Sequence, residues 1–364
     1  MKIAFTCNRL GLGGAERVIC NFVNRMINDG HESQIICLDI LEGFHYFIEK
    51  NAKIIQLDKD YKIRKGVISR KLAGLKNLCK LWNVLRKEKP DVVISFYTRQ
   101  NCYAILVCGQ LGIPVIAAER DHFFICDSKL NQLLRKWFYP KATGFIHQTD
   151  WARTYLRKNC GIKCDDLILP NPIWIKDYPE KNVIRHSVIS VGRLEEQKNY
   201  KGLIRAFNKV KEVIPDAKLT IYGEGPQREE LEKMVQDLGL YDSVFLPGTK
   251  DNILECYAKA DVFVLFSHGE GYPNALMEAL AAGLPCIASD CPIGGPADMI
   301  VNGQNGILVS LGNEVDLTKQ LMALLSNEEK KVAFSGNAKN IRSTNNFDKI
   351  YNSLMAYLNK VVER

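Results

Sequence analysis

The chain has 364 residues, and with roughly 150 residues in a typical domain this length indicates two domains. Its composition, 46% hydrophobic and 25% charged, is that of a globular protein that can bury two cores. No apolar run reaches the roughly 20 residues that cross a bilayer, and the glycines that follow the first strand exclude a secretory signal. We therefore expect a cytoplasmic protein that can touch a membrane only at its surface.

Short apolar segments alternate with helical stretches along nearly the whole chain, a pattern typical of parallel sheets covered on both faces. The strands expected in the first half are residues 2–8, 34–39, 53–57, 91–96, 114–119 and 144–148. Those expected in the second half are residues 187–192, 218–223, 244–248, 261–266, 285–289 and 306–309. Two such series in succession predict two doubly wound, Rossmann-like α/β domains that face each other across a cleft.

A proline-rich connector near residues 169–181 separates the two series. We place the first domain at 1–169 and the second at 170–345, and we expect the amphipathic segment 346–364 to pack back on the first. Ligands of doubly wound sheets bind beyond the carboxyl ends of the strands, so the loops after the strands are the candidates for chemistry.

The loop at residues 9–16 follows the first strand and opens a helix. Gly13 and Gly14 permit a close backbone approach, and the helix N-terminus offers N–H groups to an anion. Glu16 stands where a dinucleotide fingerprint requires glycine, so NAD binding is a weak interpretation. A flexible turn remains the alternative.

Two further loops carry charged residues and lead into helices. Arg193 and Lys198 lie after the first strand of the second domain, where two cations can clamp a diphosphate, although solvated surface charges are the alternative. Glu270 lies on the loop before a helix that contains Glu278. The neighbours of Glu278 are apolar nearly all round the helix, and a carboxylate buried there needs partners.

Together these residues resemble glycosyltransferase family 4, retaining enzymes with the GT-B fold, over essentially the whole chain. The resemblance rests on Gly13-Gly14-Ala15-Glu16, Asn171-Pro172, Gly192-Arg193…Lys198, Gly223-Glu224-Gly225, and Glu270 with Glu278 eight positions later.

The resemblance implies a nucleotide diphosphate sugar as donor, UDP-sugar above all, and neither a metal nor another cofactor. Arg193 and Lys198 would hold the diphosphate, Glu278 the ribose hydroxyls and Glu270 the transferred sugar. The other donor-binding residues that it implies are Gly13, Gly14, Gly223, Glu224, Gly271, Tyr272, Pro273, Asn274 and Ala275. Catalysis would be electrostatic, because the cations and helix N-termini stabilise the departing diphosphate.

One departure from the family concerns the residue that contacts the transferred sugar. Many relatives carry a histidine shortly after the strand at 114–119. Here Arg120 aligns with that histidine, and His122 follows two residues later. Both stay candidates for this catalytic role.

The net charge of +8 is concentrated in one stretch, since residues 59–89 hold eleven Lys and Arg against two acids. We expect an amphipathic helix whose buried stripe is Ile68, Leu72, Leu75, Leu78, Trp82 and Leu85. Lys76, Lys80 and Lys87 gather on an adjacent face, either as solvated charges or beside an anionic acceptor. Related enzymes that extend lipid-linked oligosaccharides favour the second interpretation, which implies a polyprenyl-diphosphate-linked glycan and a location on the inner face of the cell membrane.

Other functions fit less well. Nucleic acid is not expected, because no recognition motif accompanies the basic stretch. An epimerase of the same fold would lack the combination of Arg193, Lys198, Glu270 and Glu278, and a non-catalytic nucleotide-sugar-binding protein would have no reason to keep it.

Overall fold

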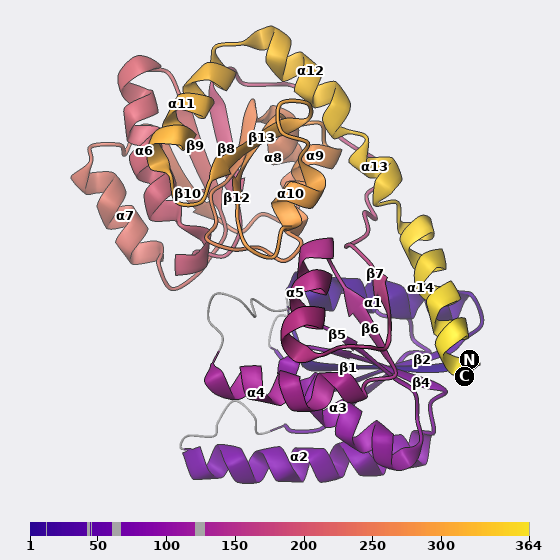
Figure 1. The fold of residues 1–364 in the computed structure, drawn as a ribbon. Coiled ribbons are helices and arrows are strands. Elements are labelled where there is room, and N and C mark those ends of the chain that lie inside the picture. The colour runs from indigo at the N-terminus through magenta and orange to yellow at the C-terminus, as the bar shows by residue number, and fades with distance from the viewer. Residues whose placement is uncertain (12, 42–43, 45, 60–66, 121–127, 364) are drawn as a thin grey trace. The chain divides into compact units, whose positions relative to one another are not determined.

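The computed structural model describes residues 1–364 except 12, 42–43, 45, 60–66, 121–127 and 364, and no side chain of 67–72 (Figure 1). The chain divides into an N-terminal unit, residues 1–171 with 348–364, and a C-terminal unit, residues 172–347. Each unit contains one parallel sheet with helices on both faces (Figure 1). The prediction of two Rossmann-like α/β domains is confirmed.

The N-terminal unit has a seven-stranded sheet of order β3-β2-β1-β4-β5-β6-β7. Its strands are β1 (Lys2–Leu10), β2 (Glu32–Ile40), β3 (Lys53–Gln56), β4 (Val92–Phe96), β5 (Val115–Ala118), β6 (Gly144–His147) and β7 (Asp165–Ile168). Its helices are α1 (Gly14–Asn28), α2 (Val67–Glu88), α3 (Thr98–Leu111), α4 (Lys129–Phe138), the 3₁₀ turn η1 (Tyr139–Lys141), α5 (Asp150–Cys160) and α14 (Phe347–Val362). The chain reverses direction across the sheet between β1 and β4, which makes the loops after these two strands the natural binding position.

Among the strands that the structure describes, β7 was not indicated by the sequence pattern. It reads Asp-Asp-Leu-Ile and lacks the apolar run of a covered strand. Charges from a neighbouring helix compensate for its polarity, because Asp166 accepts hydrogen bonds from Arg153 and Arg157 of α5. The hydroxyl of Tyr357 in α14 donates to the Asp165 carbonyl at 2.7 Å and accepts from the Phe145 amide at 2.9 Å, so α14 fastens the β6–β7 edge.

Helix α2 is rotated relative to its predicted orientation. In the part of α2 whose side chains are described, residues 73–88, the buried residues are Ala73, Asn77, Leu81 and Leu85. Leu75, expected in the buried stripe, is 64% exposed, and Leu78 and Trp82 are only partly buried. The buried polar group explains the rotation, since the Asn77 amide donates to the Asp58 carboxylate at 3.1 Å, and this bond turns the polar residue inward.

The C-terminal unit has a six-stranded sheet of order β10-β9-β8-β11-β12-β13. Its strands are β8 (Ser187–Val191), β9 (Lys218–Tyr222), β10 (Val244–Gly248), β11 (Val262–Leu265), β12 (Cys286–Asp290) and β13 (Gly306–Ser310). Its helices are the 3₁₀ turn η2 (Glu196–Lys198), α6 (Tyr200–Val213), α7 (Arg228–Asp237), α8 (Ile253–Lys259), α9 (Asn274–Ala281), α10 (Gly295–Met299), α11 (Glu314–Leu325), α12 (Glu328–Ala338) and α13 (Ile341–Thr344).

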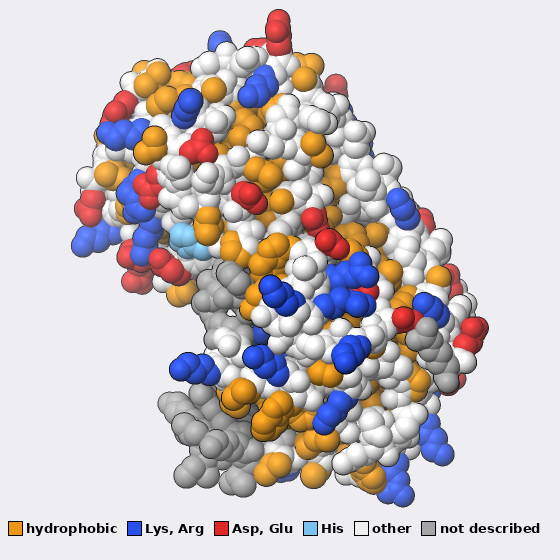
Figure 2. Space-filling model, in the orientation of Figure 1, with side chains coloured by type: hydrophobic (Ala, Val, Ile, Leu, Met, Phe, Trp, Pro, Cys, Tyr) orange, Lys and Arg blue, Asp and Glu red, His pale blue; other side chains and the backbone are white. Residues whose placement is uncertain are grey.

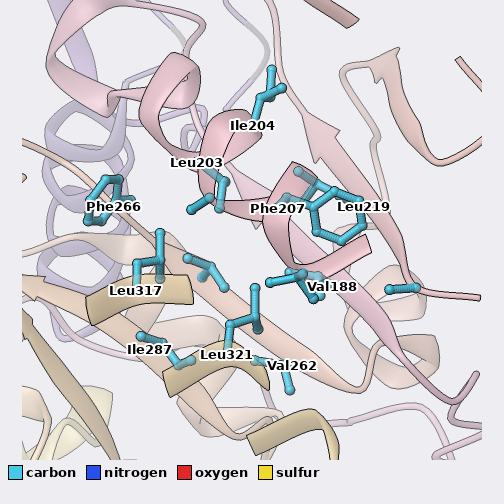
Figure 3. Packing of buried hydrophobic residues seen from close by; sticks show 14 of the residues in the cluster. Val188, Leu203, Ile204, Phe207, Leu219, Val262, Phe266, Ile287, Leu317 and Leu321 are labelled. Carbon is cyan, nitrogen blue, oxygen red and sulfur yellow. The ribbon is translucent and has the colours of Figure 1, made fainter. Parts of the chain in front are cut away.

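Two apolar clusters cover the two faces of this sheet. One lies under α6, α7 and α11, where Leu203 and Phe207 meet Leu317 and Leu321 against the strands (Figure 3). The other lies under α8, α9 and α10 and includes Leu276 and Leu280. The sheet is therefore covered on both faces, as its continuous apolar strands require.

A buried ion pair joins α12 to this core. Lys331 of α12 is 4% exposed, and its amine lies 2.8 Å from both carboxylate oxygens of Asp261, directly before β11. The same carboxylate accepts a hydrogen bond from the His186 amide at 3.0 Å. The pair holds α12 against the start of β8 and β11, at the amino-terminal end of these central strands and opposite the loops described below.

We expect Lys331→Met to lower the free energy of unfolding of the C-terminal unit by about 3–5 kcal/mol, because it leaves a buried carboxylate without its cation. Urea denaturation measures this change. Lys331→Met/Asp261→Asn should recover part of the loss, while Lys319→Met on exposed α11 surface should have little effect. Equal stability of Lys331→Met and Lys319→Met would contradict the importance of the pair.

Candidate active site

The candidate site in the C-terminal unit lies at the carboxyl ends of β8 and β11. These neighbouring strands flank the point where the chain changes direction across the sheet. The loop after β8 carries Arg193 and Lys198, and the loop after β11 carries Glu270. The topology thus brings the two predicted charged loops to one position.

Backbone contacts without intervening side chains fix the loop after β8. Gly223, directly after β9, has a φ of +143°, and a Cβ there would lie 1.9 Å from the Gly192 carbonyl oxygen. The Gly192 amide donates to the Tyr222 carbonyl at 3.0 Å, and the Leu194 amide donates to the Glu224 carbonyl at 2.9 Å. Only glycine at position 223 permits this approach, so the predicted Gly223 shapes the site through its backbone.

The loops after β11 and β12 meet in the same way. A Cβ at Gly295 would lie 2.0 Å from the Gly271 carbonyl oxygen. On the other side of the β11 loop, the His268 amide donates to the Gln197 carbonyl at 2.8 Å, and the Gln197 amide side chain donates to the Gly269 carbonyl. The loops after β8, β11 and β12 therefore form one continuous rim at the end of the sheet.

Lys198 and Glu270 form an ion pair across this rim. The Lys198 amine lies 2.6 Å from the Glu270 carboxylate, and their side chains are 17% and 5% exposed. Next to the pair, burial and then the charge of Glu270 raise the pKa of the Tyr200 hydroxyl. A protonated hydroxyl, a cation and a carboxylate thus line a largely buried polar position. The sequence predicted two of these three groups.

Arg193 does not join this pair. Its side chain is 72% exposed, and its guanidinium lies 3.0 Å from the Glu195 carboxylate. The structure therefore brings together Lys198 and Glu270, and it leaves Arg193 on the surface at the start of the same loop.

The segment after Glu270 enters α9, whose N-cap is Pro273 and whose first residue is Asn274. The Tyr272 side chain is turned into the core, where its hydroxyl accepts a hydrogen bond from the Asn345 amide at 2.7 Å. Gly271, Tyr272, Pro273, Asn274 and Ala275 therefore surround the N-terminus of α9, where backbone groups are available to a ligand.

Glu278 lies within α9 and is 7% exposed, so the prediction that its carboxylate is enclosed by apolar neighbours agrees with its position. Its charge is one of the causes that raise the pKa of Tyr178, after burial. Glu224, predicted in the donor site, pairs with Arg228 at 2.6 Å through a half-exposed side chain, which leaves its backbone to face the loop after β8.

In the N-terminal unit, the loops after β1 and β4 meet beside the predicted glycines. Gly13 is the N-cap of α1, and Gly14 is its first residue. The Glu16 carboxylate folds over Gly13 and accepts a hydrogen bond from the Tyr97 hydroxyl at 3.1 Å. Tyr97, directly after β4, has a φ of +75°, an unfavourable conformation for a residue with a side chain. Strain of this kind is common at binding sites, and no sequence motif indicated Tyr97.

Arg120 follows β5 at the same end of this sheet. Its guanidinium lies over the Phe96 ring at 5.0 Å and donates to the Asn171 side chain. Burial lowers the pKa of Arg120 to about 10, so the side chain stays charged at neutral pH. The other candidate for this position, His122, lies outside the described residues.

The basic residues predicted on α2 differ in their surroundings. Lys76 and Lys87 are exposed. Lys80 is partly buried, and its amine donates to the Leu57 carbonyl directly after β3. Two of the three lysines are therefore available at the surface of α2. Among the described residues, no cluster of His, Cys, Asp and Glu has the arrangement of a metal site.

Comparison with known proteins identifies the family. A family model described as Glycosyltransferase Family 4 matches residues 12–173, and one described as Glycosyl transferases group 1 matches residues 175–341. An N-acetyl-D-galactosaminyltransferase of Campylobacter jejuni, named for a GalNAc-containing glycan on PP-undecaprenol, is 30% identical over 344 residues, 93% of each chain. The chain belongs to the glycosyltransferases. The family predicted from the motifs is confirmed.

Other relatives of this glycosyltransferase agree. A second Campylobacter jejuni enzyme, an N-acetylgalactosaminyltransferase named for a diphospho-undecaprenol-linked glycan, is 27% identical over 382 residues, 96% of each chain. Among solved structures, TarM of S. aureus, in complex with Fondaparinux, alpha-GlcNAc-glycerol and UDP, has a TM-score of 0.81 at 15% identity and covers 99% of this chain and 100% of its own. Sucrose-phosphate synthase of Thermosynechococcus elongatus has a TM-score of 0.83 at 16% identity, with 99% and 98% covered. These structures share the GT-B fold.

We expect Gly223→Ala to lower the free energy of unfolding by about 1–3 kcal/mol more than Gly239→Ala, the usual cost of forcing atoms into a packed site. Both glycines have positive φ, +143° at Gly223 and +67° at Gly239, but at Gly239 a Cβ would meet nothing within 4 Å, so Gly239→Ala reports the cost of a positive φ without a steric clash. Urea denaturation measures both changes. Equal losses would show that the loops after β8 and β9 can separate without cost.

Proposed function

We propose that this glycosyltransferase moves a hexose or N-acetylhexosamine from a nucleotide diphosphate sugar, a UDP-sugar, to a polyprenyl-diphosphate-linked glycan at the inner face of the cell membrane. The single observation that carries the donor site is the Lys198–Glu270 pair, 2.6 Å apart on the rim where ligands of such sheets bind. Each partner keeps spare hydrogen-bonding capacity, because an ammonium has three donors and a carboxylate about four acceptor positions.

In this proposal Lys198 holds the donor diphosphate, and Arg193 turns from Glu195 to the same phosphates as a second cation. Glu270 accepts hydrogen bonds from hydroxyls of the transferred sugar, and Glu278 accepts them from the ribose. The N–H groups at the start of α9 face the phosphates. Negative charge builds up on the leaving diphosphate in the transition state, and these positive groups stabilise it there without a metal.

We infer that transfer proceeds with retention and that the departing diphosphate takes the proton of the attacking hydroxyl. Arg120 supports this arrangement on the N-terminal unit as a partly buried cation beside strained Tyr97, at the carboxyl ends of β4 and β5. His122 is the other candidate for the group that contacts the sugar.

Two observations support the acceptor class. The two Campylobacter jejuni relatives are named for undecaprenol-linked glycans, and both match this chain over more than nine-tenths of its length. In addition, Lys76 and Lys87 are exposed on α2 and would attract the diphosphate of such an acceptor.

The donor is tested by thermal shift with UDP, GDP, ADP and NAD, each with and without Mg²⁺. We expect UDP to stabilise the protein equally in both conditions, by about 2.7 kcal/mol at a hundred times its dissociation constant. A shift with NAD alone, or with no nucleotide, would contradict the proposal. A shift that requires Mg²⁺ would contradict its metal independence.

The site residues are tested by substitution. We expect Glu278→Ala to weaken UDP binding about 10- to 100-fold, because a hydrogen bond to a charged group contributes about 1.5–3 kcal/mol.

We expect Arg193→Ala to lower kcat about 100- to 1,000-fold with a smaller change in UDP affinity, because leaving-group charge peaks in the transition state. Calorimetry and initial rates separate the two effects. Arg185→Ala, an exposed arginine of the same unit, is the control, and full activity of Arg193→Ala would refute its assignment.

A further inference from the structure

Helix α4 packs on the sheet with its apolar side chains exposed and a charged side chain buried. Leu130, Leu133 and Trp137 follow the i, i+3, i+7 spacing of one helix face, and their exposed fractions are 57%, 51% and 68%. At 100° per residue, Leu133 and Trp137 lie nearly opposite Arg135, which is buried. The apolar stripe of α4 therefore points away from the sheet.

A buried network fixes this orientation. The Arg135 guanidinium lies 3.5 Å from the Glu119 carboxylate and donates to the Thr98 hydroxyl at 3.4 Å. The Tyr139 hydroxyl, one turn later, donates to the same carboxylate. Rotating α4 to bury its leucines would expose this network and break its hydrogen bonds, so the stripe is held outward.

Basic side chains flank the stripe. Lys129 and Lys136 are exposed on one side of it, and exposed Lys141 follows in η1. No carboxylate of a described residue pairs with any of these three amines. The sequences of α2, α3 and α4 contain a single acid, Glu88, which is already paired with Lys2 and Lys53.

The neighbouring helices extend the apolar surface. Helix α3 packs against both α2 and α4, so the three form one layer on the sheet (Figure 1). Leu75 of α2 and Leu106 of α3 are exposed on this layer, and a hollow of about 410 Å³ between the two helices is lined by Leu78, Trp82 and Val107. Over the N-terminal unit, hydrophobic and basic side chains lie next to each other with few acids between them (Figure 2).

We propose that the α2–α3–α4 layer is a membrane-docking face, in which Leu130, Leu133 and Trp137 enter the headgroup region of an anionic bilayer and Lys129, Lys136 and Lys141 contact its phosphates. The inference deepens the proposed function and rests on it, because a lipid-linked acceptor places the enzyme at a bilayer. An amphipathic helix with a Trp-Leu face and basic flanks has the chemistry of an interfacial helix. Among the described residues, no helix is long and apolar enough to span a bilayer.

Charge favours the bilayer over a second copy of the chain. A symmetric dimer through this layer would bring like-charged lysines together with almost no acids to neutralise them. A bilayer that contains phosphatidylglycerol offers the complementary charge and an apolar phase at once.

Co-sedimentation with vesicles of phosphatidylcholine and phosphatidylglycerol, without donor or acceptor, tests the proposal. We expect Leu130→Ser/Leu133→Ser/Trp137→Ser to weaken vesicle binding at least about 100-fold, because three large apolar side chains no longer leave water. The matched control, Val315→Ser/Val332→Ser, removes exposed apolar residues of the C-terminal unit and should bind as the unaltered protein does. The UDP thermal shift of both variants should match that of the unaltered protein, which shows that they fold.

A second variant isolates the charges. Lys129→Ser/Lys136→Ser/Lys141→Ser should weaken binding to these vesicles on the order of 100-fold, since each basic residue contributes about a factor of five at an anionic surface. Its binding to vesicles of phosphatidylcholine alone should change little.

The proposal is overturned if the unaltered protein binds neither the vesicles with phosphatidylglycerol nor those of phosphatidylcholine alone. It is overturned as well if the leucine–tryptophan variant binds the vesicles as tightly as the Val315→Ser/Val332→Ser control does. It is also overturned if sedimentation shows a dimer that this variant converts to monomers. Vesicle binding with no UDP shift and no sugar transfer would instead refute the proposed function and leave the docking face in place.

Discussion

The candidate donor site depends on the contact of backbone with backbone at the end of the C-terminal sheet. Gly223 lets the loops after β8 and β9 touch, and Gly295 does the same for the loops after β11 and β12. Because no side chain separates these loops, the position of each is determined by its neighbours. Lys198 and Glu270 can then meet across the rim with little loss of side-chain freedom. A rigid frame of this kind is what electrostatic stabilisation of a leaving group requires.

The sequence predicted the architecture well because the strands are covered on both faces and leave continuous apolar runs. It singled out Lys198 and Glu270 because both lie on loops that follow strands, but it did not indicate that the two side chains pair. It missed β7, whose polar residues are compensated by Arg153 and Arg157 of α5, because a strand pattern does not include charges from a neighbouring helix. It also misjudged the orientation of α2, because the Asn77–Asp58 hydrogen bond joins residues that hydrophobic periodicity treats as surface.

Some properties of the site follow only from coordinates. The surface position of Arg193 is a matter of side-chain direction, which spacing along the chain does not determine. The strained backbone of Tyr97 and its bond to Glu16 join two loops separated by many residues. The outward orientation of the apolar stripe of α4 also follows only from the three-dimensional structure, since the sequence of α4 alone fits a helix with its leucines buried. Glu119, whose contact with Arg135 turns the leucines outward, lies outside α4.

Helix α14 has a consequence for the order in which the protein assembles. It fastens the β6–β7 edge of the N-terminal unit through Tyr357, yet it follows the entire C-terminal unit in the chain. During synthesis, the N-terminal unit therefore cannot add α14 until the C-terminal unit has left the ribosome. Until then the Asp165 carbonyl of β7 lacks the hydrogen bond from Tyr357, and the β6–β7 edge is without the helix that fastens it.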